Sequence, residues 1–132
     1  MIVKCERLLN PNTKQFHPGP SDRGLTIGNL YSVLEISYKP DEILYRIFKN
    51  DTYEYQHPIL IRSDEFSIVT GEIPPNWELI RDEYETATLG PKVWQIFEPW
   101  EESFWQDWNN NLPKAKKCFD EELRVIFDCD AD

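Results

Sequence analysis

Alternating apolar and polar positions dominate the chain between residues 30 and 80 and predict a series of short strands. Besides the run at 30–38, runs of this kind lie at 43–48, 53–55, 58–62, 66–69 and 77–80, and polar turns such as Asn50-Asp51 separate them. In the longest run, 30–38, the alternation predicts two faces: Leu34, Ile36 and Tyr38 on one, and Tyr31, Val33 and Glu35 on the other.

The spacing of apolar residues changes near Pro91 from a period of two to steps of three and four. This spacing predicts one helix over 97–108, with Pro99 in its first turn, and a second helix from Pro113 to residue 127. The stripe expected to be buried in the first helix is Phe97, Trp100, Phe104 and Trp108. The stripe expected in the second is Leu112, Ala115, Phe119, Leu123, Ile126 and Phe127.

Together these elements predict one α+β domain over residues 1–132. Residues 1–90 are expected to be mainly β, with a loop at 10–24 where turn-forming residues are dense. Residues 91–127 are expected to be helical, and 128–132 form an acidic tail. Because the strands follow one another without βαβ alternation, we expect a small antiparallel meander that curls into a partial barrel, followed by two C-terminal helices.

Charge is the first indication of function. The 132 residues include 14 Lys and Arg against 24 Asp and Glu, a formal net charge of −10. Residues 1–66 hold 8 basic and 9 acidic side chains, whereas residues 67–132 hold 6 basic and 15 acidic ones and all five tryptophans. So acidic a surface repels phosphate backbones and anionic lipid, which argues against nucleic-acid and membrane partners and favours a cationic protein.

Several features indicate a cytoplasmic protein. The N-terminus shows no apolar signal-peptide core, and no apolar run approaches the ~20 residues needed to span a bilayer. The three cysteines, Cys5, Cys118 and Cys129, are odd in number and widely spaced, which is typical of reduced thiols.

Candidate chemistry is sparse. The two histidines, His17 and His57, each precede a proline, and no nucleotide-binding glycine motif or nucleophile elbow is present. Cys129 lies between two aspartates, but spacing places no second soft ligand beside it. We therefore expect no enzymatic activity, no metal and no cofactor.

An acidic, aromatic segment is the strongest candidate for an interaction site. On the predicted first helix, Trp105 lies at the flank of the buried stripe, near three carboxylates. The alternative is that Trp105 folds down over the sheet and the glutamates are an ordinary solvated face. The expected contact residues are Glu98, Glu101, Glu102 and Trp105, with Asp82, Glu83 and Glu85 as a second acidic group.

The second predicted helix carries charges that oppose its dipole. Lys114, Lys116 and Lys117 crowd its first turn, and Asp128, Asp130 and Asp132 follow its end. Either these charges serve a partner or the tail frays into solvent, and fraying is the interpretation favoured for Asp130 and Asp132. Further candidate contacts on this helix are Asp120, Glu121 and Glu122.

Several segments together have a recognisable pattern: Leu25-Thr-Ile-Gly28-x-x-Tyr31-x-Val33, Tyr55-Gln-His-Pro58, Glu65-Phe66-Ser-Ile68, Ile73-Pro-Pro-Asn-Trp77, 94–108 and 113–122. Through these segments, residues 25–123 resemble SH3-like barrels of small bacterial immunity proteins, which are encoded beside polymorphic or contact-dependent growth-inhibition toxins. It implies an SH3-like partial barrel, no catalytic residues, and a cognate basic toxin domain, such as a nuclease, as the partner.

Two other functions remain open at this point. The chain is alternatively an SH3-like adaptor without a toxin partner, whose tyrosines form a peptide groove. That groove would use Tyr31, Tyr45, Tyr53 and Tyr55. A third hypothesis is a small enzyme that uses His17 or His57.

Overall fold

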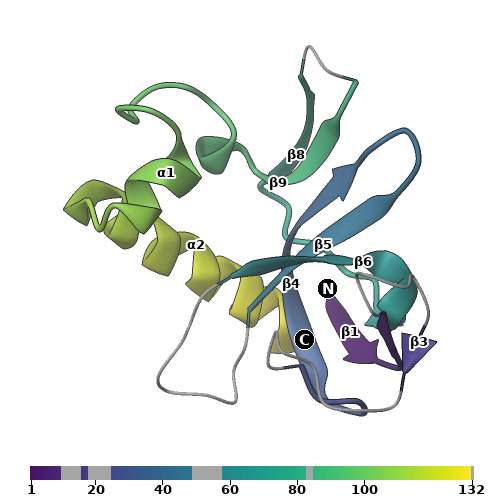
Figure 1. Ribbon diagram of the computed structural model, residues 1–132. Coiled ribbons are helices and arrows are strands. Elements are labelled where there is room, and N and C mark those ends of the chain that lie inside the picture. The colour runs from purple at the N-terminus through teal and green to yellow at the C-terminus, as the bar shows by residue number, and fades with distance from the viewer. Residues whose placement is uncertain (10–15, 18–24, 49–57, 83–84, 132) are drawn as a thin grey trace.

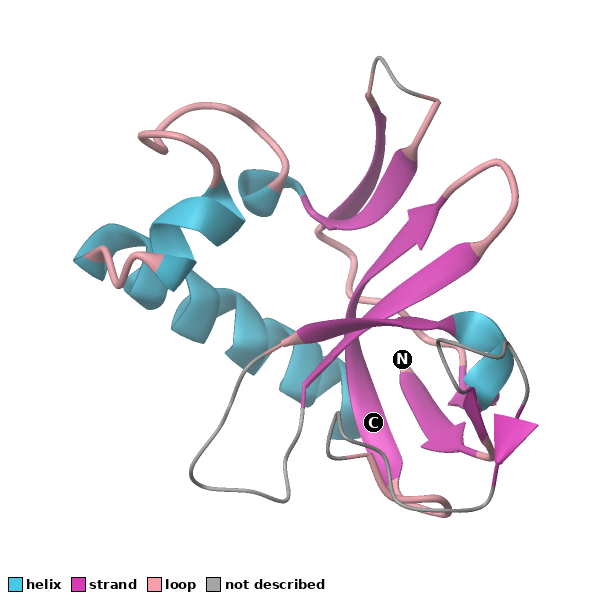
Figure 2. Ribbon diagram, viewed as in Figure 1, coloured by secondary structure: helices cyan, strands magenta, loops and turns pink. Residues whose placement is uncertain are grey.

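The computed structural model describes residues 1–9, 16–17, 25–48, 58–82 and 85–131, and it has the α+β architecture expected from the sequence (Figures 1 and 2). Its strands are β1 (Ile2–Cys5), β2 (Leu8–Leu9), β3 (Phe16–His17), β4 (Leu30–Tyr38), β5 (Ile43–Phe48), β6 (Ile59–Arg62), β7 (Phe66–Thr70), β8 (Trp77–Arg81) and β9 (Ala87–Pro91). Its helices are the 3₁₀ turns η1 (Ser63–Glu65) and η2 (Lys92–Trp94), then α1 (Phe104–Asn109) and α2 (Pro113–Ala131).

The strand β4 organises the main antiparallel sheet. One edge of β4 pairs with β5 along almost its whole length, while the other edge pairs first with β1 and then with β9. The strands β4, β5 and β6 form the predicted meander, but β1 inserts between β4 and β7, and β8 pairs only with β9. The strands β1, β2 and β9 were not predicted from the sequence. Of the predicted loop 10–24, Phe16–His17 is β3, and the rest lies outside the described residues, as does the predicted strand 53–55.

The sheet curls because its two ends are tied together. The strands β6 and β7 lie at opposite ends of the order β6-β5-β4-β1-β7, yet only the three residues of η1 join them. No pairing links β6 to β7 among the described residues, so the sheet stays open as a partial barrel. Its concave side is filled by aromatic rings, since Tyr31 and Tyr45 lie 6.4 and 6.0 Å from the ring of Phe66.

A bulge in β4 changes which residues share a face. Directly opposed residues of antiparallel strands point to the same side, and the register slips between Val33 and Glu35. Val33 and Ile36 pair with Ile47 and Tyr45, which lie two residues apart on β5 and so share a face. The predicted faces of β4 are therefore wrong beyond Val33, because Leu34 is the extra residue. Consequently Glu35, which pairs with Arg46, points to the convex side.

The helix α2 covers the convex side of the sheet, behind β4 in Figure 1. The ring of Phe48 on β5 lies 6.1 Å from Phe119 and 5.9 Å from Phe127, and Ala115 and Ile126 are also buried. The predicted stripe is thus confirmed except at Leu112, which precedes the helix. The predicted boundary at 127 and the fraying of Asp130 are wrong. The helix continues to Ala131, and Asp130 makes an ion pair with the terminal amino group of Met1.

The predicted first helix is also wrong, because α1 begins only at Phe104. Ser103 is its N-cap and accepts a hydrogen bond at 3.2 Å from the backbone N–H of Gln106. The preceding residues form turns, including a backbone hydrogen bond from Trp100 to Phe97 and a cis Glu98–Pro99 peptide. Trp100, Phe104 and Trp108 are buried as expected, whereas Phe97 is 86% exposed.

A cluster of aromatic rings joins the helices to the sheet. Trp94 stacks on Phe104 at 5.0 Å and on Phe119 at 5.7 Å, and these rings belong to the same buried core as the strand residues. Neither helix of the described residues, α1 or α2, combines the length and apolar character that a bilayer-spanning helix needs.

Candidate functional site

The segment between η2 and α1 presents an aromatic side chain among carboxylates; residues 96–102 are called the acidic loop below. Phe97 is 86% exposed, the largest exposure among the described large apolar residues, and Ile96 beside it is 37% exposed. Glu98, Glu101 and Glu102 are all exposed. The structure therefore brings the three predicted glutamates together in a loop, with Phe97 rather than Trp105 as their exposed aromatic neighbour.

A buried carboxylate fixes the backbone of the acidic loop. Asp107 is 2% exposed and accepts hydrogen bonds from the backbone N–H groups of Glu101 at 2.8 Å and Glu102 at 3.2 Å. Charge-assisted bonds of this kind are among the stronger hydrogen bonds in proteins. Because both N–H groups are held by Asp107, the side chains of Glu101 and Glu102 project from a preorganised turn.

Trp105 lies against the sheet, which is the alternative that the sequence left open. Its indole N–H donates to Oε1 of Glu35 at 3.1 Å, and the guanidinium carbon of Arg46 lies 4.1 Å from the centre of its ring. The ring also makes edge-on contacts with Trp94 at 5.2 Å and Phe104 at 4.8 Å, and with Trp108 and Phe119 at 6.1 Å each. The prediction that Trp105 shares a helix with the glutamates is wrong, because Glu98, Glu101 and Glu102 precede the start of α1 at Phe104. A role in binding stays a prediction.

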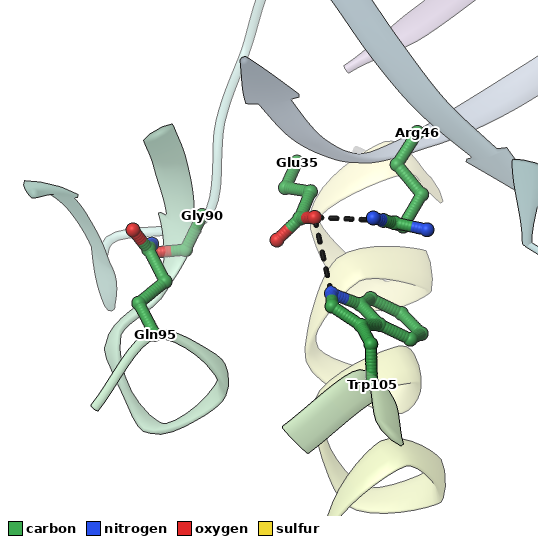
Figure 3. A network of polar contacts seen from close by, with 5 residues as sticks. All are labelled: Glu35, Arg46, Gly90, Gln95 and Trp105. Atoms are coloured by element: carbon green, nitrogen blue, oxygen red, sulfur yellow. Dashed lines mark hydrogen bonds and ion pairs between the residues drawn. The ribbon is translucent and has the colours of Figure 1, made fainter. Parts of the chain in front are cut away.

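Glu35 accepts the hydrogen bond of Trp105 and also binds Arg46 (Figure 3). Its carboxylate is 5% exposed, and Oε1 accepts from Nε of Arg46 at 2.7 Å as well as from Trp105. A buried carboxylate needs such partners, since an isolated buried charge is costly. The bulge in β4 places Glu35 here, on the convex side of the sheet and beneath α1.

Gln95 and Gly90 border the same region. The side-chain amide of Gln95 donates to the backbone oxygens of Gly90 at 3.1 Å and Glu78 at 3.2 Å, so it ties the end of η2 to the hairpin β8–β9. A Cβ atom on Gly90 would lie 2.7 Å from Cβ of Glu35. Only glycine lets β9 approach Glu35 this closely.

A cleft of about 290 Å³ opens between the β8–β9 hairpin and α1, and is called the Glu35 cleft below. The sheet contributes Glu35, Ser37 and Arg46, and Trp94, Gln95 and Trp105 line the side of the helices. The hairpin side is lined by Ile80, Asp82, Thr86 and Thr88. No local pattern in the sequence predicts this site, because its lining converges from β4, β5, the β8–β9 hairpin, the end of η2 and α1.

Of the second predicted acidic group, Asp82 and Glu85 lie at the tip of this hairpin. Asp82 and Thr86 close the turn, with the backbone N–H of Thr86 donating to Oδ1 of Asp82 at 3.0 Å. Glu85 is exposed and adopts a left-handed backbone with φ of 64°. Glu83 lies outside the described residues. Asp82 thus belongs both to an exposed acidic tip and to the lining of the Glu35 cleft.

A larger cavity, of about 460 Å³, lies at the tip of the β4–β5 hairpin beside η1. Charges of both signs line it, including Lys39 and Asp41, and Arg62 pairs there with Asp64 at 2.8 Å. Both partners of that pair are about two-fifths exposed, so the cavity is an open surface hollow. It has neither the buried carboxylate nor the tryptophans of the Glu35 cleft.

The other charged residues singled out on α2 differ in their surroundings. Lys116 lies 3.4 Å above the ring of Trp108, which accounts for one of the lysines that oppose the helix dipole. Glu122 accepts a hydrogen bond from Asn76 at 2.7 Å, and Glu121 lies 4.0 Å from Lys117, while Asp120 is exposed.

Two tyrosines of the predicted peptide groove are buried on the concave side of the sheet. Tyr31 is 1% and Tyr45 8% exposed, and Tyr53 and Tyr55 lie outside the described residues. His57 also lies outside them, and His17 belongs to β3. Within the described ranges no three His, Cys, Asp or Glu side chains lie close enough to hold a metal ion, and a metal-free protein stays a prediction.

No protein-family model, curated protein or solved structure matches this chain. The resemblance of residues 25–123 to bacterial immunity proteins accordingly stays a prediction. The same holds for a cationic toxin partner and for the contact roles expected of the acidic residues.

Proposed function

We propose that this chain is an immunity protein that binds and neutralises a cognate cationic toxin domain, with the acidic loop as its main contact. The observation that carries the proposal is the exposure of Phe97 among Glu98, Glu101 and Glu102 in one loop. The resemblance of residues 25–123 to immunity proteins supports the same conclusion.

Charge supports a basic partner. The second half of the chain holds 15 acidic and 6 basic residues, and three of the carboxylates project from the acidic loop. Carboxylates at one face accelerate the encounter with a cationic surface and repel anionic competitors such as nucleic acid. A nuclease domain is basic because it must hold phosphates, so it fits this field.

Phe97 supplies an apolar contact surface, which the carboxylates of the acidic loop do not provide. Large aromatic residues are enriched at the centre of protein interfaces, where the surrounding polar residues exclude water. The loop around Phe97 is also preorganised, because Asp107 binds the backbone of Glu101 and Glu102. A preorganised contact loses less conformational entropy on binding.

The test uses the C-terminal domain encoded by the reading frame directly upstream as the toxin. Reversal of Glu98, Glu101 and Glu102 to Lys should slow association by at least about tenfold at low salt and flatten its salt dependence. The matched control reverses three exposed carboxylates on other surfaces: Asp41, Glu72 and Asp128. It makes the same change in net charge but should leave most of the association rate intact.

A second variant separates contact from steering. Phe97→Ser should raise the dissociation rate by about tenfold or more, as expected for a buried aromatic in an interface, with little effect on association. Protection of cells that express the toxin should fall with both variants. Unchanged protection and unchanged rates in both would refute the acidic loop as the contact, and absence of any protection by the wild-type chain would refute the immunity function.

A further inference from the structure

The Glu35 cleft contains a buried acceptor that the fold does not use fully. Glu35 is 4% exposed, and both of its hydrogen bonds, from Arg46 and from Trp105, end on the same oxygen, Oε1. The other oxygen has no hydrogen-bond partner among the described residues. In Figure 3 it points away from Arg46, toward the side where Gln95 and Gly90 lie. Both Glu35 and Gln95 line the cleft.

The charge balance of the cleft favours a cation. Its lining holds two carboxylates, Glu35 and Asp82, and one cation, Arg46. Arg46 already interacts with other residues of the chain, since its Nε binds Glu35 and its guanidinium lies over the ring of Trp105. The hydroxyl groups of Ser37, Thr86 and Thr88 supply further acceptors.

The size of the cleft suits one extended side chain. Its volume is about 290 Å³, which equals the liquid volume of roughly ten water molecules at ~30 Å³ each. Trp94 and Trp105 line its inner side, and indole surfaces are favourable neighbours for the methylene stem and the charged head of a basic residue.

We propose that the Glu35 cleft binds a guanidinium or ammonium group, and that in the complex it takes one Arg or Lys side chain of the toxin. This proposal depends on the proposed function only for the identity of the partner that supplies the side chain. Gln95, which lines it, directly precedes the acidic loop, so a protein that contacts the loop can reach the cleft. The loop then supplies steering and the cleft a single specific pocket.

The experiment titrates the free protein with N-acetyl-arginine methylamide and records the indole N–H signals of Trp94 and Trp105 by NMR. Binding should shift these signals, with a dissociation constant in the millimolar range. Blocked citrulline, a neutral isostere of arginine, and blocked glutamate are the matched controls. Equal shifts with citrulline, stronger shifts with glutamate, or no saturable shift with arginine would each overturn the proposal.

Two variants assign the binding to the cleft. Glu35→Gln should weaken arginine binding roughly tenfold or more, and Asp82→Asn, which keeps the acceptor for Thr86, should weaken it about threefold. Glu78→Gln serves as the control, since Glu78 is exposed, pairs with Lys92 at 3.8 Å and lies outside the lining. Should Glu35→Gln fail to fold, Asp82→Asn carries the test, and unchanged binding in it would refute the cleft.

The cation site in the cleft and the immunity function can be refuted independently of each other. If loop variants abolish toxin binding while blocked arginine fails to bind the free protein, the cleft is refuted and the immunity function stands. If blocked arginine binds as expected but the wild-type chain binds no toxin, the cleft stands as a cation site and the proposed partner is refuted.

Discussion

Gly90 lies against Glu35 so closely that a Cβ atom on it would be 2.7 Å from Cβ of Glu35 and 3.5 Å from its Cα. The contact fixes the distance between β9 and β4 at the point where Glu35 turns toward Arg46 and Trp105. The Glu35 cleft therefore depends on the absence of a side chain at residue 90.

Gly90→Ala should destabilise the protein by about 1–3 kcal/mol, because the new methyl group meets a neighbouring strand rather than a flexible side chain. Chemical denaturation measures this loss, and the indole signal of Trp105 should shift as Glu35 moves. Gly71→Ala is the control, since no atom lies within 4 Å of a Cβ added there. Equal stability of the two variants would contradict the proposed contact.

Asp107→Asn tests whether the acidic loop is preorganised. An amide accepts hydrogen bonds at only one of its two ends, so the N–H of Glu101 or Glu102 loses its partner. We expect faster hydrogen exchange at these two amides and a loss of about 1–3 kcal/mol in stability. Asp120→Asn, at an exposed position on α2, should change neither. Unaltered exchange in Asp107→Asn would show that other contacts hold the loop.

Much of the sheet could be predicted from the sequence, because the two-residue period of a strand is visible in the strand's own residues. The bounds predicted for β4 and β5, 30–38 and 43–48, match the structure. The faces of β4 did not follow beyond Val33, because a bulge depends on the register with the neighbouring strand. The contact of Glu35 with Trp105, 70 residues away, has no local signal at all.

The start of α1 had a signal that the apolar stripe concealed. Phe97, Trp100, Phe104 and Trp108 have helical spacing, but that spacing also arises where a turn precedes a helix. Ser103 followed by Gln106 is a capping-box sequence and marks a start at Phe104. The consequence for function is large, because Phe97 becomes exposed and the glutamates occupy a loop.

The two ends of the described chain are joined by a buried ion pair. The amino group of Met1 binds Oδ1 of Asp130, and their side chains are 6% and 7% exposed. The labels N and C lie close together in Figure 1. The pair links β1 to the last turn of α2 and so ties the sheet to the helix that covers it.

Asp130→Asn should lower the free energy of unfolding by about 3 kcal/mol, the lower end of the range for loss of one partner of a buried pair. Acetylation of the amino terminus removes the other charge, so the two changes combined should cost much less than their sum. Asp128→Asn, exposed on the same helix, should stay within about 0.5 kcal/mol of the wild type. Additive losses would exclude a direct interaction between Met1 and Asp130.

Burial alters the titration of the Cys118 thiol. Burial, together with the charge of Glu122, raises the pKa of the Cys118 thiol from about 9 to about 11, against a smaller opposing effect of Trp94. Between these values the folded chain keeps a proton that the unfolded chain has released. Stability must therefore fall as the pH rises through this window.

Cys118→Ala should remove this alkaline loss. The wild type should lose about 1–2 kcal/mol more than the variant between pH 9 and pH 11, less than a full shift of two units implies, because the thiol is half-buried. Urea denaturation of both proteins at pH 8, 9, 10 and 11 measures the difference. Cys129→Ala keeps Cys118 and should parallel the wild type. A constant gap between wild type and Cys118→Ala across the four pH values would contradict the raised pKa of Cys118.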